Sequence, residues 1–157
     1  GGPHDIAAGR VTVFAGGSED AFARARPVLA CYADPVLHVG ALGAGQKVKL
    51  VNNTLFAAQI GLLAEAAGLA DRLGVEEAAL LRALPHGSGA SRALANVVRA
   101  GSAAAFIDAV GEFIGKDVAV VRRTVAELGA DLGALDEVVD AGLGRRTAFN
   151  GGAPKRN

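Results

Sequence analysis

The chain has 157 residues, of which 51% are hydrophobic and 20% are charged, with 16 basic and 16 acidic side chains. This hydrophobic content excludes a chain that is disordered throughout. The length suffices for one good core, or for one domain and a fragment of another. The formal net charge of zero argues against binding to nucleic acid or to a membrane surface by bulk electrostatics.

Residues 1–39 have the character of a small α/β unit. The segment RVTVFAGG (10–17) is rich in β-branched residues and ends in glycine, which predicts a strand. Ser18, followed by two acidic residues, predicts the N-cap of a helix in which Pro27 introduces a kink or a break. PVLHVG (35–40) predicts a second strand. One such unit buries too little to be stable alone, so we expect it to belong to a larger sheet.

From Gly45 onward the pattern is helical. Residues 45–73 predict one helix of roughly 43 Å, with leucines at helical spacing and Gly74 as its C-terminal stop. Because alanines cover its other faces, we expect this helix to be buried on most sides. Further helices are predicted at 76–84, from an N-cap at Ser88, at 105–128 and at 134–143, before a basic, flexible tail at 145–157.

Cysteine and histidine give little sign of a site. The single cysteine, Cys31, excludes an intrachain disulfide, and its apolar surroundings predict a buried, inert thiol. The three histidines are too scattered to predict a metal site. The sequence has no apolar run of about 18 residues and does not open with a signal peptide pattern, so we expect a cytoplasmic protein. It begins with GGP rather than Met, as though taken from a longer chain.

The segment GALGAGQKVKLVNN (40–53) raises a catalytic hypothesis. Lys49 and Asn53 are four residues apart, so they share one face of the predicted helix. The N-terminal helix dipole and burial both favour a neutral amine at Lys49, which proton transfer near neutral pH requires. The Asn53 carboxamide offers a donor and an acceptor that could hold a hydroxyl, carbonyl or carboxylate beside it. The alternative is a solvated lysine beside a polar patch.

This segment resembles the G-x-x-G-x-G-x-x-x-K-x-x-N-N signature of the β-hydroxyacid dehydrogenases, the 3-hydroxyisobutyrate dehydrogenase-like family related to 6-phosphogluconate dehydrogenase. The opening GGP resembles the end of that family's S-G-G motif, and GKDVAVV (115–121) resembles its K-D-L-x-L-A helix. Residues 10–29 are similar to the last strand and helix of its Rossmann domain. The resemblance implies a mostly α fold, with a Rossmann-type remnant at residues 1–40 and the family's all-helical C-terminal domain at 41–144.

The resemblance also implies roles for single residues. Lys49 matches the catalytic lysine, a general acid in carbonyl reduction and a general base in alcohol oxidation. Asn53, Gly1 and Gly2 match substrate-binding residues. Lys116 matches a lysine close to the nicotinamide, and the implied cofactor is NAD or NADP, which carries the hydride.

Three features separate the chain from the complete family pattern. Ala109 stands where a phenylalanine is usual, and both the serine before Gly1 and the G-x-G-x-x-G loop are missing. Because proton transfer alone cannot reduce a carbonyl, we expect the isolated chain to be inactive. For Lys116 the alternative is a solvated charge pair with Asp117, which we expect to be structural.

The expected function is therefore that of the C-terminal part of an NAD(P)-dependent oxidoreductase acting on a small hydroxyacid or carbonyl. Its expected partners are a small-molecule substrate and a second copy of the chain, bound through helix 45–73. The alternative is a non-catalytic helical dimerisation module, which would not need Lys49 together with Asn53. An imine reductase relative is a third possibility, but those enzymes usually replace the lysine.

Overall fold

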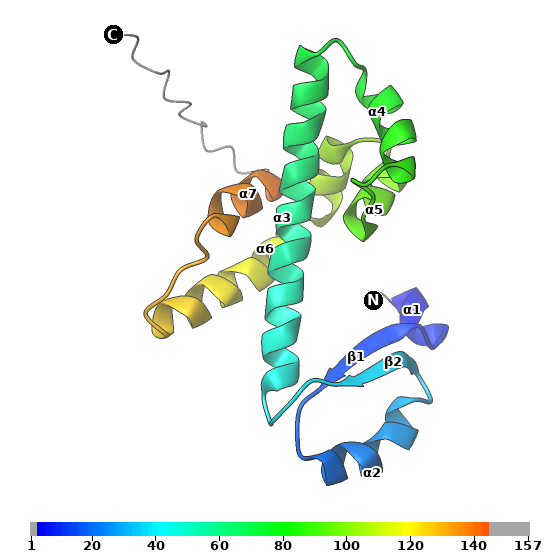
Figure 1. Ribbon diagram of the computed structural model, residues 1–157, viewed down its shortest axis with the longest axis vertical. Coiled ribbons are helices and arrows are strands. Elements are labelled where there is room, and N and C mark those ends of the chain that lie inside the picture. Colours follow the sequence, from blue (N-terminus) through cyan, green and yellow to red (C-terminus); the bar gives the residue numbers. More distant parts are fainter. Residues whose placement is uncertain (1–2, 145–157) are drawn as a thin grey trace. The chain divides into compact units, whose positions relative to one another are not determined.

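The computed structural model describes residues 3–144 and is mostly helical, with one small parallel sheet (Figure 1). Gly1, Gly2 and the predicted tail at 145–157 lie outside the described residues. The chain divides into two compact units, of which the first ends at Asn52 and the second begins at Asn53. This division falls inside a continuous helix, α3 (Ala44–Arg72), whereas the predicted domain boundary after residue 40 stays a prediction.

The first unit contains the predicted strand–helix–strand motif. Before the start of α3 it holds α1 (Pro3–Ala7), β1 (Val11–Ala15), α2 (Glu19–Leu29) and β2 (Ala33–His38). The two strands pair in parallel, with Phe14 opposite Leu37, and a parallel pair needs a crossover of the kind that α2 supplies. Ser18 is the N-cap of α2 as predicted, because its Oγ accepts a hydrogen bond from the backbone N–H of Ala21 at 3.3 Å.

Little of the first unit is buried. Among residues 5–52, only Ala33 and Gly45 are buried. Gly45 places α3 directly on β1, since a Cβ added there would overlap the carbonyl oxygen of Phe14. Two strands and one crossover helix make a smaller assembly than a sheet that is stable by itself, which supports the expectation of a larger sheet.

The end of α2 decides one alternative and corrects one prediction. The helix continues through Pro27 to Leu29, so the predicted break is not found, because a proline this close to the C-terminus removes a single backbone hydrogen bond. Cys31 is exposed, and the prediction of a buried thiol is wrong. No residue of α2 is buried, so the apolar segment around Cys31 has no core to enter. The Cys31 Sγ donates to the carbonyl oxygen of Pro27 at 3.3 Å.

The second unit is an all-helical bundle. Beyond the remainder of α3 it consists of α4 (Glu77–Ala83), the 3-10 helix η1 (Leu84–His86), α5 (Arg92–Ala100), α6 (Ala103–Glu127) and α7 (Leu135–Gly142). In Figure 1, α4 and α5 lie to one side of the C-terminal part of α3, and α7 lies to the other. The predicted long helices are confirmed within two residues at each end.

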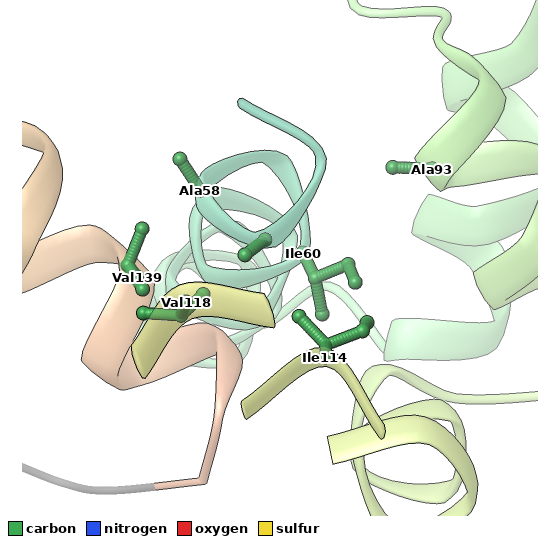
Figure 2. Close-up of a cluster of buried hydrophobic side chains, with 7 residues drawn as sticks. Ala58, Ile60, Ala93, Ile114, Val118 and Val139 are labelled. Carbon is green, nitrogen blue, oxygen red and sulfur yellow. The ribbon is translucent and has the colours of Figure 1, made fainter. Parts of the chain in front are cut away.

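The main core of the bundle joins four helices. Ile60 of α3 faces Ile114 of α6, while Val118 of α6 and Val139 of α7 lie toward Ala58 on α3 (Figure 2). Each of these five residues is at most 6% exposed. A smaller cluster packs under the connection from α4 to α6, and its buried members are Leu81, Leu94, Val97 and Ala103.

The burial of α3 is one-sided, which corrects the expectation that most of its faces would be covered. Leu55, Leu62 and Leu69 are 49%, 57% and 50% exposed. These three residues recur every seven positions and form one stripe along the helix, which we call the α3 leucine stripe. The side of α3 that the bundle covers carries smaller residues, such as Ala57 and Ala58, and these let the neighbouring helices approach closely.

Two capping arrangements set the helix starts in the bundle. The predicted N-cap at Ser88 is wrong: α5 begins at Arg92, and the Oγ of Ser91 accepts from the backbone N–H of Leu94 at 3.0 Å. Residues 88–89 form a turn within the connection 87–91, as its two glycines favour. At the start of α6, the Glu77 carboxylate from α4 accepts from the backbone N–H of Ala103 at 2.9 Å.

A charged cluster holds α7 against α6. Arg122 donates from Nε to Asp136 and from a terminal nitrogen to Asp140, each at 2.8 Å. The hydrogen bond to Asp140 is the largest cause that raises the pKa of Arg122, with Asp136 adding to it against the opposing effect of burial. Within residues 3–144 no single helix is long and apolar enough to cross a membrane, and α5 with α6 reach that length only as a pair bent by 112°.

Candidate active site

The glycine-rich segment leads directly into the helix that carries the candidate catalytic residues. Gly43, at a φ of +87°, supplies a left-handed turn that favours glycine, and α3 begins at the next residue. Lys49 and Asn53 both lie on α3, at the spacing of residues that share one helix face. The first turn of α3 carries no acidic residue.

Lys49 is exposed, so the expected burial of its amine is not found in the part of the chain that the structure describes. The physical reason is the small size of the first unit, where few residues pack around the start of α3. Exposure leaves the amine accessible to a ligand. Because the protein itself does not cover the Lys49 amine, only a bound ligand could displace the water around it.

The Asn53 side chain is held by a residue from a distant part of the sequence. Its Nδ2 donates to the Asp117 Oδ2 at 2.7 Å, across from α3 to α6, and the contact is partly buried. An ionised carboxylate only accepts hydrogen bonds, so the nitrogen end of the Asn53 carboxamide is the end that must face Asp117. Hydrogen bonds to a charged acceptor are stronger than those between neutral groups.

The structure separates Lys116 from Asp117, although the two are adjacent in sequence. The Nζ of Lys116 lies 3.3 Å from the Glu112 Oε1, one turn earlier on α6, and the Lys116 side chain is 73% exposed. Neighbouring residues of a helix point in different directions, and the ion pair that Lys116 makes is with Glu112 rather than with Asp117, the partner in the alternative interpretation. Such an exposed pair holds its lysine weakly, which leaves Lys116 available to an anionic ligand.

Sequence reasoning identified Asn53 but missed its partner. Asp117 was expected to be structural, and the 64 residues that separate it from Asn53 give no spacing signal that could pair them. The resemblance around GKDVAVV was the one indication that this part of α6 contributes to the site. The predicted substrate-binding glycines, Gly1 and Gly2, lie outside the described residues.

The described residues fit one end of a nicotinamide cofactor better than the other. The amine of Lys49 and the carboxamide of Asn53 are groups that can form hydrogen bonds with a small polar molecule beside a nicotinamide ring. The described residues offer less to the pyrophosphate group of the cofactor. The glycine-containing turn between β1 and α2 leads into a helix with Glu19 and Asp20 in its first turn. Two negative side chains at a helix start oppose the binding of a phosphate. No group of three potential metal ligands is found within residues 3–144.

Comparison with known proteins assigns the family. Residues 43–140 match the family described as the NAD-binding domain of NADP-dependent 3-hydroxyisobutyrate dehydrogenase. The chain belongs to this family, and the predicted resemblance and the predicted cofactor, NAD or NADP, are confirmed by it.

The individual relatives agree with this assignment. A probable 3-hydroxyisobutyrate dehydrogenase of Mycobacterium tuberculosis is 39% identical over 89 residues, which are 57% of this chain and 30% of that protein. The 2-(hydroxymethyl)glutarate dehydrogenase of Eubacterium barkeri is 36% identical over 94 residues, 60% of this chain and 31% of that protein.

A solved structure extends the similarity beyond the matched domain. The Mycobacterium tuberculosis 3-hydroxyisobutyrate dehydrogenase with L-serine is similar at a TM-score of 0.75 and 30% identity, over 89% of this chain and 51% of that one. The present chain therefore spans about half the length of this solved relative.

Proposed function

We propose that the chain is the C-terminal part of an NAD(P)-dependent dehydrogenase that interconverts a small hydroxyacid and its carbonyl form. The family assignment supports the reaction class. The observation that carries the assignment of the site is the hydrogen bond from Asn53 to Asp117, because it gives the carboxamide a fixed orientation on the helix that also carries Lys49. A carboxamide that only filled space would not need an acceptor from another helix.

In this proposal Lys49 moves the proton and Asn53 positions the substrate. The amine takes the proton of the substrate hydroxyl during oxidation and returns one to the carbonyl oxygen during reduction. The cofactor supplies or accepts the hydride. Because Lys49 is exposed, the substrate can reach its amine, and substrate binding itself displaces water from around it.

Lys116, Gly1 and Gly2 keep supporting roles in the proposal. Lys116 would leave its exposed ion pair with Glu112 and bind the cofactor or a substrate carboxylate instead. The two glycines would contact the substrate through their backbone. The described residues give the pyrophosphate little support, so the isolated chain is proposed to be inactive until the remainder of a nucleotide-binding domain is supplied.

A chimera tests this function. The chain would replace the corresponding half of the Mycobacterium tuberculosis relative, and NADH formation would be followed with 3-hydroxyisobutyrate. Lys49→Ala is expected to lower kcat by about 100-fold or more, and Lys49→Arg should not rescue it because a guanidinium does not release its proton. Lys47→Ala, which removes a lysine from another face of α3, should retain the rate. Full turnover in Lys49→Ala would overturn the assignment.

Self-association is a second proposed property, and the α3 leucine stripe favours it. Three half-exposed leucines at seven-residue spacing make a surface that a second copy of α3 could cover. The chain would then form a homodimer through helix 45–73, as the sequence predicts. A dimer that shows no turnover in the chimera would favour the non-catalytic dimerisation module instead. A cytoplasmic location and the absence of nucleic-acid or membrane partners stay predictions.

A further inference from the structure

We propose that His38 is a positioning residue, which holds the connection between β1 and α2 (residues 16–18) against the start of α3 and so fixes the segment that carries Lys49. The proposal rests on the proposed function, because it gives the residue that transfers the proton a rigid support. All the residues involved lie in the first compact unit. His38 itself lies outside the signature at residues 40–53.

Two contacts fix the imidazole of His38, the last residue of β2. Its Nε2 lies 2.8 Å from the carbonyl oxygen of Gly17. Because a carbonyl oxygen only accepts hydrogen bonds, the Nε2 must carry a proton and donate it. The Phe22 ring of α2 stacks on the imidazole, with 4.9 Å between the ring centroids and an angle of 19° between the planes. The stacking restrains the ring across its face, and the hydrogen bond restrains it within its plane.

The backbone of Gly17 is held on both sides. Its N–H donates to the carbonyl oxygen of Gly40 at 2.9 Å, and its own carbonyl oxygen accepts from His38. Gly40 has a φ of +124°, which favours glycine, and it leads into the start of α3. A connection that bound a phosphate would have to offer its N–H groups to the ligand, whereas the N–H of Gly17 is used by the protein. The connection therefore links the sheet to α3.

The connection lies directly on the start of α3, backbone to backbone. A Cβ added at Gly16 would overlap the carbonyl oxygen of Ala41, just as one added at Gly45 would overlap that of Phe14. Since no side chain separates these backbones, a displacement of the connection would displace the first turn of α3. Lys49 lies about one turn after Gly45 on the same helix, so its amine would move with that turn.

Nuclear magnetic resonance of the intact chain tests whether His38 holds the connection. The nitrogen chemical shifts of the imidazole are expected to show a proton on Nε2, and the backbone N–H of Gly17 is expected to exchange slowly with water. His38→Phe keeps a ring against Phe22 but has no donor. It should speed the exchange of Gly17 about tenfold, the worth of one hydrogen bond.

His38→Gln is the conservative variant. Its side-chain nitrogen is as many bonds from Cα as the Nε2 of histidine, so it can donate to the same carbonyl oxygen and should restore most of the protection. His86→Phe replaces another exposed histidine and should leave the exchange of Gly17 unchanged. Equal exchange rates of Gly17 in the unsubstituted chain, in His38→Phe and in His38→Gln would overturn the role of His38.

The chimera with the Mycobacterium tuberculosis relative tests the consequence for the reaction. His38→Phe is expected to lower kcat about tenfold, because a misplaced catalytic group loses rate, with little change in the KM for 3-hydroxyisobutyrate, and His38→Gln should recover most of the rate. An unchanged kcat in His38→Phe would overturn the positioning of Lys49. An unsubstituted chimera without turnover would contradict the proposed function instead, while the exchange of Gly17 would still decide whether His38 holds the start of α3.

Discussion

Gly61 of α3 and Gly142 of α7 meet backbone to backbone at the point where the two helices cross. A Cβ added at Gly61 would overlap the carbonyl oxygen of Val138, and one added at Gly142 would overlap that of Ala57. Both glycines are buried. Because these two positions carry no side chain, α7 can lie close enough to α3 for its own Val139 to enter the core.

Gly61→Ala is expected to destabilise the bundle by about 2 kcal/mol or more, since the added methyl group must push the two backbones apart. Gly68→Ala, seven positions along the same helix, is the matched control. Its nearest neighbour would be the Arg72 side chain at 3.6 Å, so it should stabilise α3 by about 0.5 to 1 kcal/mol through helix propensity. Urea denaturation of both variants measures the effects, and an unfolding midpoint for Gly61→Ala at or above that of Gly68→Ala would contradict the crossing.

Ser91→Ala is expected to cost about 1 kcal/mol of unfolding free energy, because the first turn of α5 then loses the acceptor for the Leu94 N–H. Ser88→Ala should change the stability by less than about 0.5 kcal/mol, since Ser88 lies in the preceding turn. Thermal unfolding of the two variants side by side compares the sites. A larger loss of unfolding free energy for Ser88→Ala than for Ser91→Ala would support the N-cap at Ser88 that the sequence predicted.

These two serines show where local sequence signals reach their limit. Both are plausible N-caps, and the choice between them depends on how the connection at 87–91 lets Leu94 and Val97 of α5 pack against Leu81 of α4. That packing involves residues far apart in the chain. The long helices were easier to predict from the sequence, because their periodic apolar residues extend over many turns. An error of one or two residues at an end of such a helix leaves most of its predicted range correct.

Leu62→Glu is expected to convert a dimer of the chain into a monomer, because it places a charge in the middle of the α3 leucine stripe. Leu62 is 57% exposed, so the change should leave the fold of the monomer intact. Leu128→Glu, at a residue that is 77% exposed outside the stripe, should leave the dimer unchanged. Sedimentation velocity gives the masses. If the unsubstituted chain is already a monomer at high concentration, the proposed dimer is wrong.

Cys31 is expected to react with a thiol reagent in the folded chain, because its side chain is exposed. The extent of labelling should be the same with and without urea, and Cys31→Ser should abolish it. Absorbance of the released chromophore measures the reaction. Labelling that begins only after unfolding would support the buried thiol that the sequence predicted.

The site residues named from the sequence stay a prediction. Lys49 and Asn53 could be named because their spacing is local to one helix and their signature is distinctive. Asp117 was not identifiable as the partner of Asn53, since that contact depends on the way α6 crosses α3. The exposure of Lys49 was missed for a related reason: helix position alone does not determine how much protein surrounds a side chain.

The two contacts of Arg122 have a consequence for α7, a short helix of the bundle's core. Asp136 and Asp140 are one turn apart, so the Arg122 guanidinium binds two successive turns of α7 on the same face. A single ion pair would still allow α7 to rotate about its own axis. Two ion pairs to the same guanidinium restrict both this rotation and a shift along the axis. An eight-residue helix has little intrinsic stability of its own, so this double grip fixes the angular setting that keeps Gly142 turned toward Gly61.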